Sequence, residues 1–298
     1  MTDHSPPVSG NLRGIALMLV SMAGFAIEDV FIKLLAREMG VAQILILLGI
    51  AGGALFAIWT LRSGQRLLSA DLLARPVILR NLCETAGTLC FVTALALAPL
   101  SSVAAVLQSM PLVVTLGAVL FLGERVGWRR WSAIFVGFAG VLMIIRPGME
   151  AFQPASLFAV GAALWLGLRD LATRATPPAI TSTQLATYAY VAVTLAGIVL
   201  LPFGPDPVLP SATGWALVLA ATLVGVIAYY AITAAMRVGD VAVITPFRYS
   251  RLVFALILAV LIFGERPDAM TLTGAAVIIA SGLVVILREG RGSAEQSG

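Results

Sequence analysis

Long apolar runs follow one another along almost the whole chain, separated by short stretches that carry charges, proline or glycine. Each run has about 20 residues, the length that an α-helix needs to cross the hydrocarbon core of a bilayer. We therefore predict an all-α membrane protein with ten transmembrane helices. They are expected at Leu12–Ala36, Val41–Leu61, Val77–Leu97, Leu100–Leu122, Trp128–Ile145, Ala155–Ala175, Thr181–Phe203, Gly214–Met236, Val241–Phe263 and Met270–Leu287.

The second half of the chain repeats the first at an offset of 141 positions. The offset aligns the Gly-Glu-Arg segment at 123–125 with the same segment at 264–266, and it aligns Asp29 with Asp170. Because each half has an odd number of predicted spans, the second half enters the membrane from the opposite side, which makes an inverted repeat. The predicted units are a cytoplasmic tail at 1–11, five-helix repeats at 12–148 and 149–290, and a second tail at 291–298.

The composition agrees with a membrane location and predicts an orientation. Of the 298 residues, 60% are hydrophobic and 11% are charged, with a mean hydropathy of +1.00. If the N-terminus is cytoplasmic, eleven basic residues fall on the inner side and three on the outer side. Cytoplasmic loops retain an excess of lysine and arginine, so both termini are predicted inside, in a multi-pass protein of the bacterial inner membrane.

Several classes of function lack their sequence signals. No G-x-x-x-x-G-K-[ST] phosphate loop occurs, so this chain is not expected to hydrolyse ATP. The only histidine, His4, lies in the polar tail, while Cys83 and Cys90 share one apolar run. No metal site, cofactor, disulfide or nucleic-acid partner is expected, and the chain is predicted not to be an enzyme. Residues 1–11 lack the features of a cleaved signal peptide, so the first run is expected to be retained.

Two arginines lie within the ninth apolar run. Arg248 and Arg251 are three residues apart and therefore share a helix face. An arginine at mid-membrane costs ~2.5–3.5 kcal/mol even on insertion scales, so such residues normally face a polar interior. Since a guanidinium can hold a carboxylate through two hydrogen bonds, both arginines are predicted to bind a substrate carboxylate. The alternative is a structural ion pair with Glu28 or Glu84.

The third and fourth runs contain further polar candidates. Glu84 lies well inside the third run, close to Asn81, and is predicted to be a buried carboxyl group that binds a proton or a cationic group. An ion pair of Glu84 with Arg80 or Arg251 is the equally weighted alternative. Gln108, in the fourth run, is predicted to add a polar contact to the same site.

Acid and base recur four residues apart at aligned positions of the two halves. Asp29 precedes Lys33, and Asp170 precedes Arg174. This repetition favours structural pairs near the ends of the spans. Asp29 and Asp170 remain candidates for proton sites.

Two acidic positions break the repeat. Glu28 aligns with Arg169, and Glu84 aligns with Gly225. Such asymmetry indicates a specific use, so Glu28 is also a candidate proton or ion-pair site.

Aromatic residues and prolines complete the candidate site. Trp165, Tyr230 and Tyr249 lie deeper in their runs than interfacial aromatic residues do, so they are predicted to shape a pocket for an aromatic or cationic substrate. Pro111 and Pro246 remove backbone donors within the fourth and ninth runs. They are predicted hinges, although simple helix curvature is the alternative.

The architecture and the Gly-Glu-Arg segments at the ends of the fourth and ninth runs resemble the drug/metabolite transporter superfamily, EamA type, over residues 12–287. The aromatic amino acid and paraquat exporter branch is the most similar. The resemblance implies a carrier, proton-linked or cation-independent, that moves amino acids, related metabolites or toxic organic compounds, usually outward. It also implies a cavity lined mainly by the first, third, fourth, sixth, eighth and ninth spans.

We therefore predict a secondary transporter that exports amino acids, related metabolites or organic cations by alternating access. A channel would need a continuous polar stripe along several helices, which the sequence lacks. A duplicated helical scaffold without transport activity is the other alternative. The expected partners are a small-molecule substrate and the lipid bilayer, and the sequence leaves open whether the protein is a monomer or a homodimer.

Overall fold

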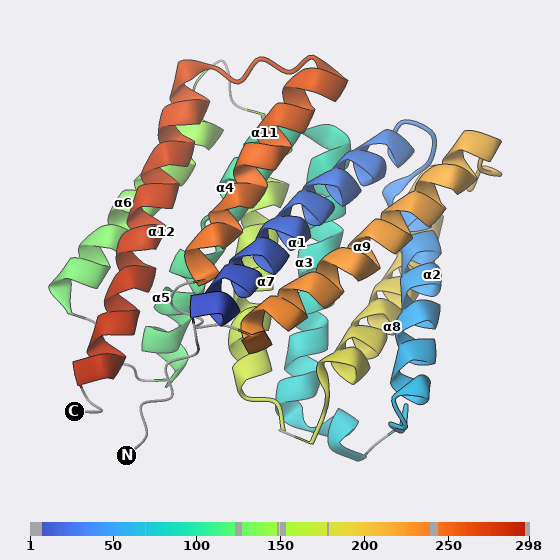
Figure 1. Cartoon of the computed structure of the whole chain (residues 1–298). Coiled ribbons are helices and arrows are strands. Elements are labelled where there is room, and N and C mark those ends of the chain that lie inside the picture. The colour runs from blue at the N-terminus through green and yellow to red at the C-terminus, as the bar shows by residue number, and fades with distance from the viewer. Residues whose placement is uncertain are drawn as a thin grey trace.

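The computed structural model describes residues 8–68, 70–122, 127–147, 149, 153–177, 179–238 and 244–295. Within these ranges every regular element is a helix (Figure 1). The α-helices are α1 (Val8–Leu35), α2 (Val41–Arg62), α3 (Arg75–Leu97), α4 (Leu100–Leu107), α5 (Met110–Leu122), α6 (Trp128–Ile145), α7 (Ser156–Arg174), α8 (Ser182–Leu200), α9 (Ala212–Val238), α11 (Ser250–Phe263) and α12 (Ala269–Glu295). Three short 3₁₀ helices, η1 (Ala70–Leu73), η2 (Leu201–Phe203) and η3 (Thr245–Tyr249), lie between them.

Eight segments are long and apolar enough to cross a membrane, and two shorter apolar helices lie at Trp131–Ile145 and Ala269–Val284. These ten segments coincide with the ten predicted runs. The prediction of an all-α membrane protein is confirmed. Large side chains such as Leu120, Phe121 and Phe135 are mostly exposed, as expected for surfaces that face lipid.

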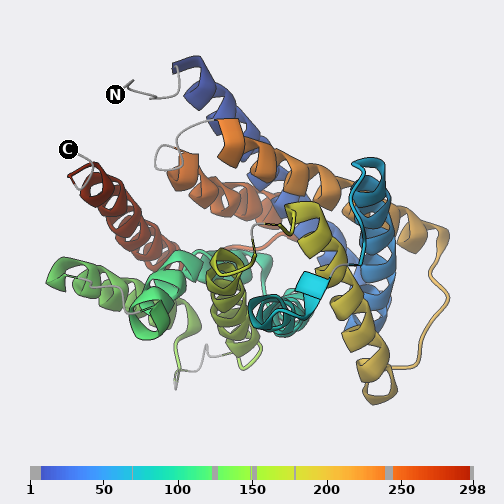
Figure 2. The ribbon, with the colours of Figure 1, turned by 90° about the horizontal axis from the view of Figure 1, so that it is seen from below.

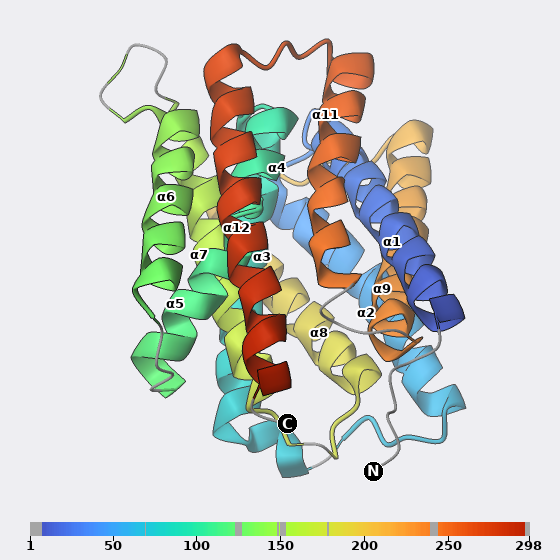
Figure 3. The ribbon, with the colours of Figure 1, turned by 60° about the vertical axis from the view of Figure 1, so that its left-hand side comes forward.

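The fourth predicted span is not one continuous helix. It is divided at Gln108 and Ser109, between α4 and α5 (Figure 3). Pro111 is the second residue of α5, a position at which the missing backbone donor leaves no hydrogen bond unmade. The Ser109 hydroxyl donates to the Val106 carbonyl oxygen at 2.7 Å, which satisfies one acceptor at the end of α4.

The ninth predicted span changes its helix type. Pro246 lies in η3, which continues directly into α11; residues 239–243 lie outside the described ranges. Pro111 therefore begins a helix after a break, whereas Pro246 lies in a 3₁₀ segment at the start of α11. Movement at either proline remains a prediction.

The most extensive helix contacts all join the first half of the chain to the second. They pair α1 with α9, α2 with α8, α3 with α7 and α6 with α12, and α4 packs on α11. Figure 2 shows the pair α6 and α12 on one side of the bundle and the pair α2 and α8 on the opposite side. The first turn of α1 and the last turn of α12 lie at the same end (Figure 1). Among the described helices, packing between the halves is more extensive than packing within either half.

Glycines allow two of these pairs to approach closely. A Cβ atom on Gly140 of α6 would lie 2.8 Å from the Gly274 carbonyl oxygen, and one on Gly274 of α12 would lie 2.7 Å from the Gly140 carbonyl oxygen. At the crossing of α2 and α8, a Cβ on Gly197 would lie 2.8 Å from the Ala42 carbonyl oxygen. Small residues at such crossings permit the backbone contact that drives helix association in lipid.

A polar contact joins the ends of α6 and α12 outside the spans. Arg146, which ends α6 in the left-handed conformation with φ 53°, forms an ion pair with Asp268. The hydrogen bond from Arg146, together with those from Thr271, holds the pKa of the Asp268 carboxyl group below its usual range.

Candidate functional site

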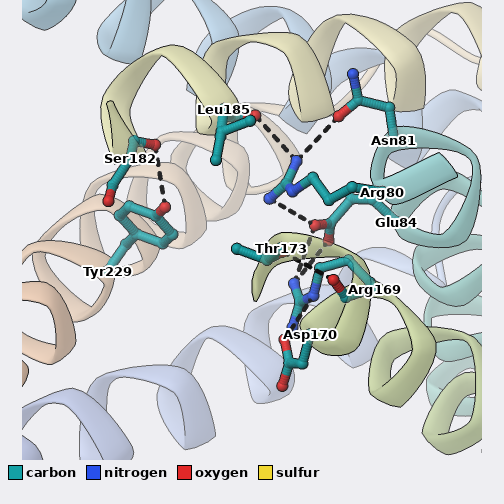
Figure 4. Close-up of polar contacts among 9 residues, drawn as sticks. All are labelled: Arg80, Asn81, Glu84, Arg169, Asp170, Thr173, Ser182, Leu185 and Tyr229. Atoms are coloured by element: carbon teal, nitrogen blue, oxygen red, sulfur yellow. Dashed lines mark hydrogen bonds and ion pairs between the residues drawn. The ribbon is translucent and has the colours of Figure 1, made fainter. Parts of the chain in front are cut away.

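Four charged side chains form a network where α3 and α7 face each other (Figure 4). Glu84 lies between two guanidinium groups, with Oε2 3.0 Å from Arg80 Nη2 and 2.9 Å from Arg169 Nη1. Arg169 Nε lies 2.9 Å from Asp170 Oδ1. Two positive and two negative charges balance within this group, as burial of charge in a membrane protein requires.

Hydrogen bonds from neighbouring helices fix the network. Arg80, only 5% exposed, donates from Nη1 to the Leu185 carbonyl oxygen at 3.0 Å and to Asn81 Oδ1 at 3.1 Å. The Tyr229 hydroxyl donates to the Ser182 carbonyl oxygen at 3.2 Å beside it (Figure 4). The network therefore connects α3 and α7 to α8, with Tyr229 of α9 beside it.

A second ion pair joins α1 to α11. Arg251 Nη2 lies 2.8 Å from both carboxylate oxygens of Asp29, and Arg251 Nε donates to Oδ2 at 3.3 Å. The guanidinium carbon lies 5.3 Å from the ring centroid of Phe25 and 5.6 Å from that of Phe91. Asp29 is 2% exposed, so this pair is held inside the bundle between two aromatic rings.

The two charged groups lie along one face of α3. Phe91, which contacts Arg251, follows Glu84 by seven residues, which is two helical turns or ~10 Å along the axis. The Tyr190 ring of α8 stacks on Phe56 of α2, with 5.6 Å between the ring centroids. The two charged groups are supplied by α3 with α7 and by α1 with α11.

Within the segments that could cross a membrane, two partly buried charged residues have no counter-ion in the described part of the chain. Glu28 of α1 makes no hydrogen bond or ion pair with a described residue, and neither does Arg248 of η3. Both are partly exposed, although they belong to segments that cross the membrane. A charge in such a position normally has a partner, so both groups are available to a ligand.

The bundle is closed at the end where α1, α3 and α11 finish. Glu265 accepts hydrogen bonds from Leu100 N at 2.7 Å, from Ser101 N at 2.9 Å and from the Ser101 hydroxyl at 2.7 Å. Its carboxylate thereby caps the N-terminus of α4, where the helix dipole favours a negative charge. Lys33 Nζ lies 3.9 Å from Glu265 and donates to the Leu95 and Ala98 carbonyl oxygens.

Replacement of Glu265 by glutamine is expected to lower stability by ~1–2 kcal/mol, because the charge at the α4 N-terminus and the contact with Lys33 are both lost. The measurement is the apparent melting temperature in detergent. Cys83 is buried and Cys90 partly buried, so labelling of their thiols by a maleimide reports unfolding. Asp206→Asn, at an exposed carboxylate, is the control, and equal melting of the two variants would contradict the prediction.

Several predicted pairings are corrected by the structure. Asp29 pairs with Arg251 rather than with Lys33, whose ammonium group reaches the ends of α3 and α11 instead. Glu84 pairs with Arg80, as one alternative held, but not with Arg251. Sequence spacing identified neighbours on one helix and could not identify partners on another.

The partner of Asp170 is also on its own helix. Asp170 contacts Arg169, and the side chain of Arg174 is not described. The other predicted charged residues therefore enter two groups: Glu84 and Asp170 lie in the network of α3 and α7, and Asp29 and Arg251 lie between α1 and α11.

The remaining predicted residues are dispersed. Asn81 accepts a hydrogen bond from Arg80 in the network, and Gln108, 8% exposed, lies at the break after α4 with its amide nitrogen unpaired. Tyr249 is buried against Gly282 of α12, and Tyr230 packs on Trp59, 5.3 Å between ring centroids, with its side chain half exposed. The structure thus brings neither tyrosine to the charged groups.

Trp165 fits the site better. It precedes Arg169 by one turn of α7 and therefore lies on the same helix face, with 39% of its surface exposed. Its role in binding remains a prediction.

The sequence reasoning missed one contributor. Arg169 was considered only as a break in the repeat, but it contacts both Glu84 and Asp170. Its mid-span position was the available signal.

These features define a helical membrane protein whose interior holds charged groups from both halves of the chain. The EamA-like transporter family matches residues 12–146 and 153–287, so the chain belongs to this family and contains its domain twice. Within the described residues, no three His, Cys, Asp or Glu side chains are grouped as metal ligands.

Relatives over most of the chain have different named substrates. The S-adenosylmethionine uptake transporter of Rickettsia conorii is 30% identical over 93% of this chain and 94% of its own length. The riboflavin transporter of Vibrio cholerae is 32% identical over 59% of each chain, and the pseudopaline exporter CntI of Pseudomonas aeruginosa is 23% identical over 90% and 94%. A solved crystal structure, 22% identical, has the same fold with a TM-score of 0.62 over 93% of this chain and 98% of its own.

Proposed function

We propose that the protein is a secondary carrier for a small metabolite that bears an α-amino-acid group, and that it works by alternating access. The observation that carries the proposal is the unpaired guanidinium of Arg248. Arg248 lies one turn before Arg251 in a segment that could cross the membrane, and it has no counter-ion among the described residues. The other bases described inside the bundle each have a counter-ion: Lys33, Arg80, Arg169 and Arg251. A guanidinium without a counter-ion suits a substrate carboxylate.

The arrangement of the helices supports alternating access. If the halves are inverted repeats of five spans each, α1 corresponds to α7 and α3 to α9, so the pair α1·α9 is equivalent to the pair α7·α3. The pairs α2·α8, α4·α11 and α6·α12 each join two corresponding helices. A fold with this pseudo-symmetry can exchange the conformations of its halves and so open toward either side. The proposal includes ten spans, cytoplasmic termini and a location in the bacterial inner membrane.

Relatives indicate which α-amino acid derivative to test first. S-adenosylmethionine carries a carboxylate, an ammonium group and a sulfonium group, and transporters named for it match this chain over nearly its full length. Free amino acids, aromatic or otherwise neutral, are the second candidate class. Export was predicted from the resemblance, whereas the S-adenosylmethionine relatives are named for uptake, so both directions are tested.

The first experiment is counterflow in liposomes that contain the purified protein, with labelled S-adenosylmethionine and labelled phenylalanine. A carrier gives saturable flux that is stimulated by unlabelled substrate on the opposite side. Flux that does not saturate would indicate a channel, and the absence of flux with both substrates would contradict the proposal.

Replacement of Arg248 by glutamine is expected to weaken S-adenosylmethionine binding by at least about tenfold, because a charge-assisted hydrogen bond to the carboxylate is lost. Decarboxylated S-adenosylmethionine, which lacks this carboxylate, should bind both proteins equally. Arg62→Gln, at an exposed arginine at the end of α2, is the control. An equal loss of affinity for both ligands would remove Arg248 from the carboxylate site.

A further inference from the structure

Glu28 faces a glycine where its counterpart in the other half of the chain faces a charge. A Cβ atom on Gly225 of α9 would collide with the Glu28 carboxylate, so the two residues are in direct contact across α1 and α9. The sequence repeat aligns Glu28 with Arg169 and Gly225 with Glu84. Arg169 and Glu84 form the ion pair between α7 and α3, 2.9 Å apart.

The equivalent positions therefore hold a complete ion pair between α3 and α7, but only one charged residue, Glu28, between α1 and α9. In α3 and α7 the base and the acid are both supplied by the protein. In α1 and α9 the acid is present, but the position opposite it has no side chain. The missing half is a positive charge.

The surroundings of Glu28 supply no such charge. Among the described residues, the nearby base Arg251 is held by both oxygens of Asp29 and by the rings of Phe25 and Phe91. Glu28 is partly exposed.

We propose that Glu28 binds a positively charged group of the substrate, which completes the ion pair that the glycine at 225 leaves open. This inference rests on the proposed carrier function and adds to it a preference for substrates with a cationic group beyond the α-amino-acid group. Gly225 leaves the position that faces Glu28 without a side chain, so the carboxylate can occupy it.

Matched ligands test the inference directly. S-adenosylmethionine and S-adenosylhomocysteine differ in the sulfonium charge, and arginine and citrulline differ in the side-chain charge. Binding of each ligand to the detergent-solubilised full chain is measured for the wild type, Glu28→Gln and Gly225→Ala. Gly127→Ala, where a Cβ would meet no atom within 4 Å, is the matched control for the glycine variant. Thiol labelling confirms that each variant is folded.

We expect the wild type to prefer the cationic member of at least one pair by about tenfold or more, as one charge-assisted interaction provides. Glu28→Gln should remove that preference and leave the affinity for the neutral member within about twofold of the wild-type value. Gly225→Ala should weaken the preference, and Gly127→Ala should not.

The opposite outcomes overturn the inference. The inference is wrong if the wild type binds neither cationic ligand, or if it binds the cationic and neutral members of each pair equally. It is also wrong if Glu28→Gln still prefers the cationic member. If Glu28→Gln is not folded, Gly225→Ala decides, and an unchanged preference in that variant overturns the inference. Binding with the expected preference but no saturable flux in liposomes would instead contradict the carrier function and leave the role of Glu28 in place.

Discussion

Glu84→Gln is expected to destabilise the protein by ~3–5 kcal/mol, because breaking a buried ion pair leaves an uncompensated charge. The variant would leave Arg80 and Arg169 close together on facing helices, with Asp170 as the remaining acid of the network. Thermal unfolding in detergent, followed by maleimide labelling of the two cysteines, measures the effect.

The control for this variant is Asp206→Asn, which makes the same change from carboxylate to amide at an exposed position. Its melting temperature should remain that of the wild type. If Glu84→Gln also melts at the wild-type temperature, the two arginines do not require this carboxylate, and the network does not hold α3 against α7.

The second large effect concerns the pair of α1 and α11. Asp29→Asn is expected to cost ~3–5 kcal/mol of stability, because Arg251 then lies inside the bundle without a counter-ion. Arg251→Gln should also destabilise the protein, since it leaves Asp29 beside Glu28. The double variant should be more stable than the sum of the single effects predicts.

A double-mutant cycle from thermal unfolding measures this coupling, which is expected at ~0.5–3 kcal/mol for residues in direct contact. Strictly additive effects would contradict the pairing. Counterflow by the double variant adds separate information: loss of flux in a stable protein would show that the pair also takes part in transport.

The places of the spans could be predicted from the sequence because each run carries its own signal. A run of about 20 apolar residues is sufficient to predict a helix, whatever it packs against. The break at Gln108 and Ser109 was less evident. Pro111 indicated a disturbance, but a proline can either curve a helix or begin a new one, and the apolar composition continues through both.

Pairing between helices could not be predicted from one sequence. Asp29 and Lys33 have the spacing of a helical ion pair, yet Asp29 lies level with Arg251 on a helix more than 200 residues later in the chain. In a buried setting, a side chain takes the partner that best replaces its lost hydration, wherever that partner lies in the sequence. The asymmetric positions Glu28 and Glu84 were correctly identified as unusual, but only the contacts distinguish their surroundings.

The packing of α1 on α9, α2 on α8, α3 on α7 and α6 on α12 has a consequence for the origin of the fold. The apolar faces of each half are covered mainly by the other half, so a protein with only one of them would have lacked an interior. If the halves are inverted, such an ancestor would have been stable as a dimer of oppositely inserted copies. Duplication of its gene would then have joined two partners that already required each other, and it would have allowed residues such as Glu84 and Gly225 to diverge.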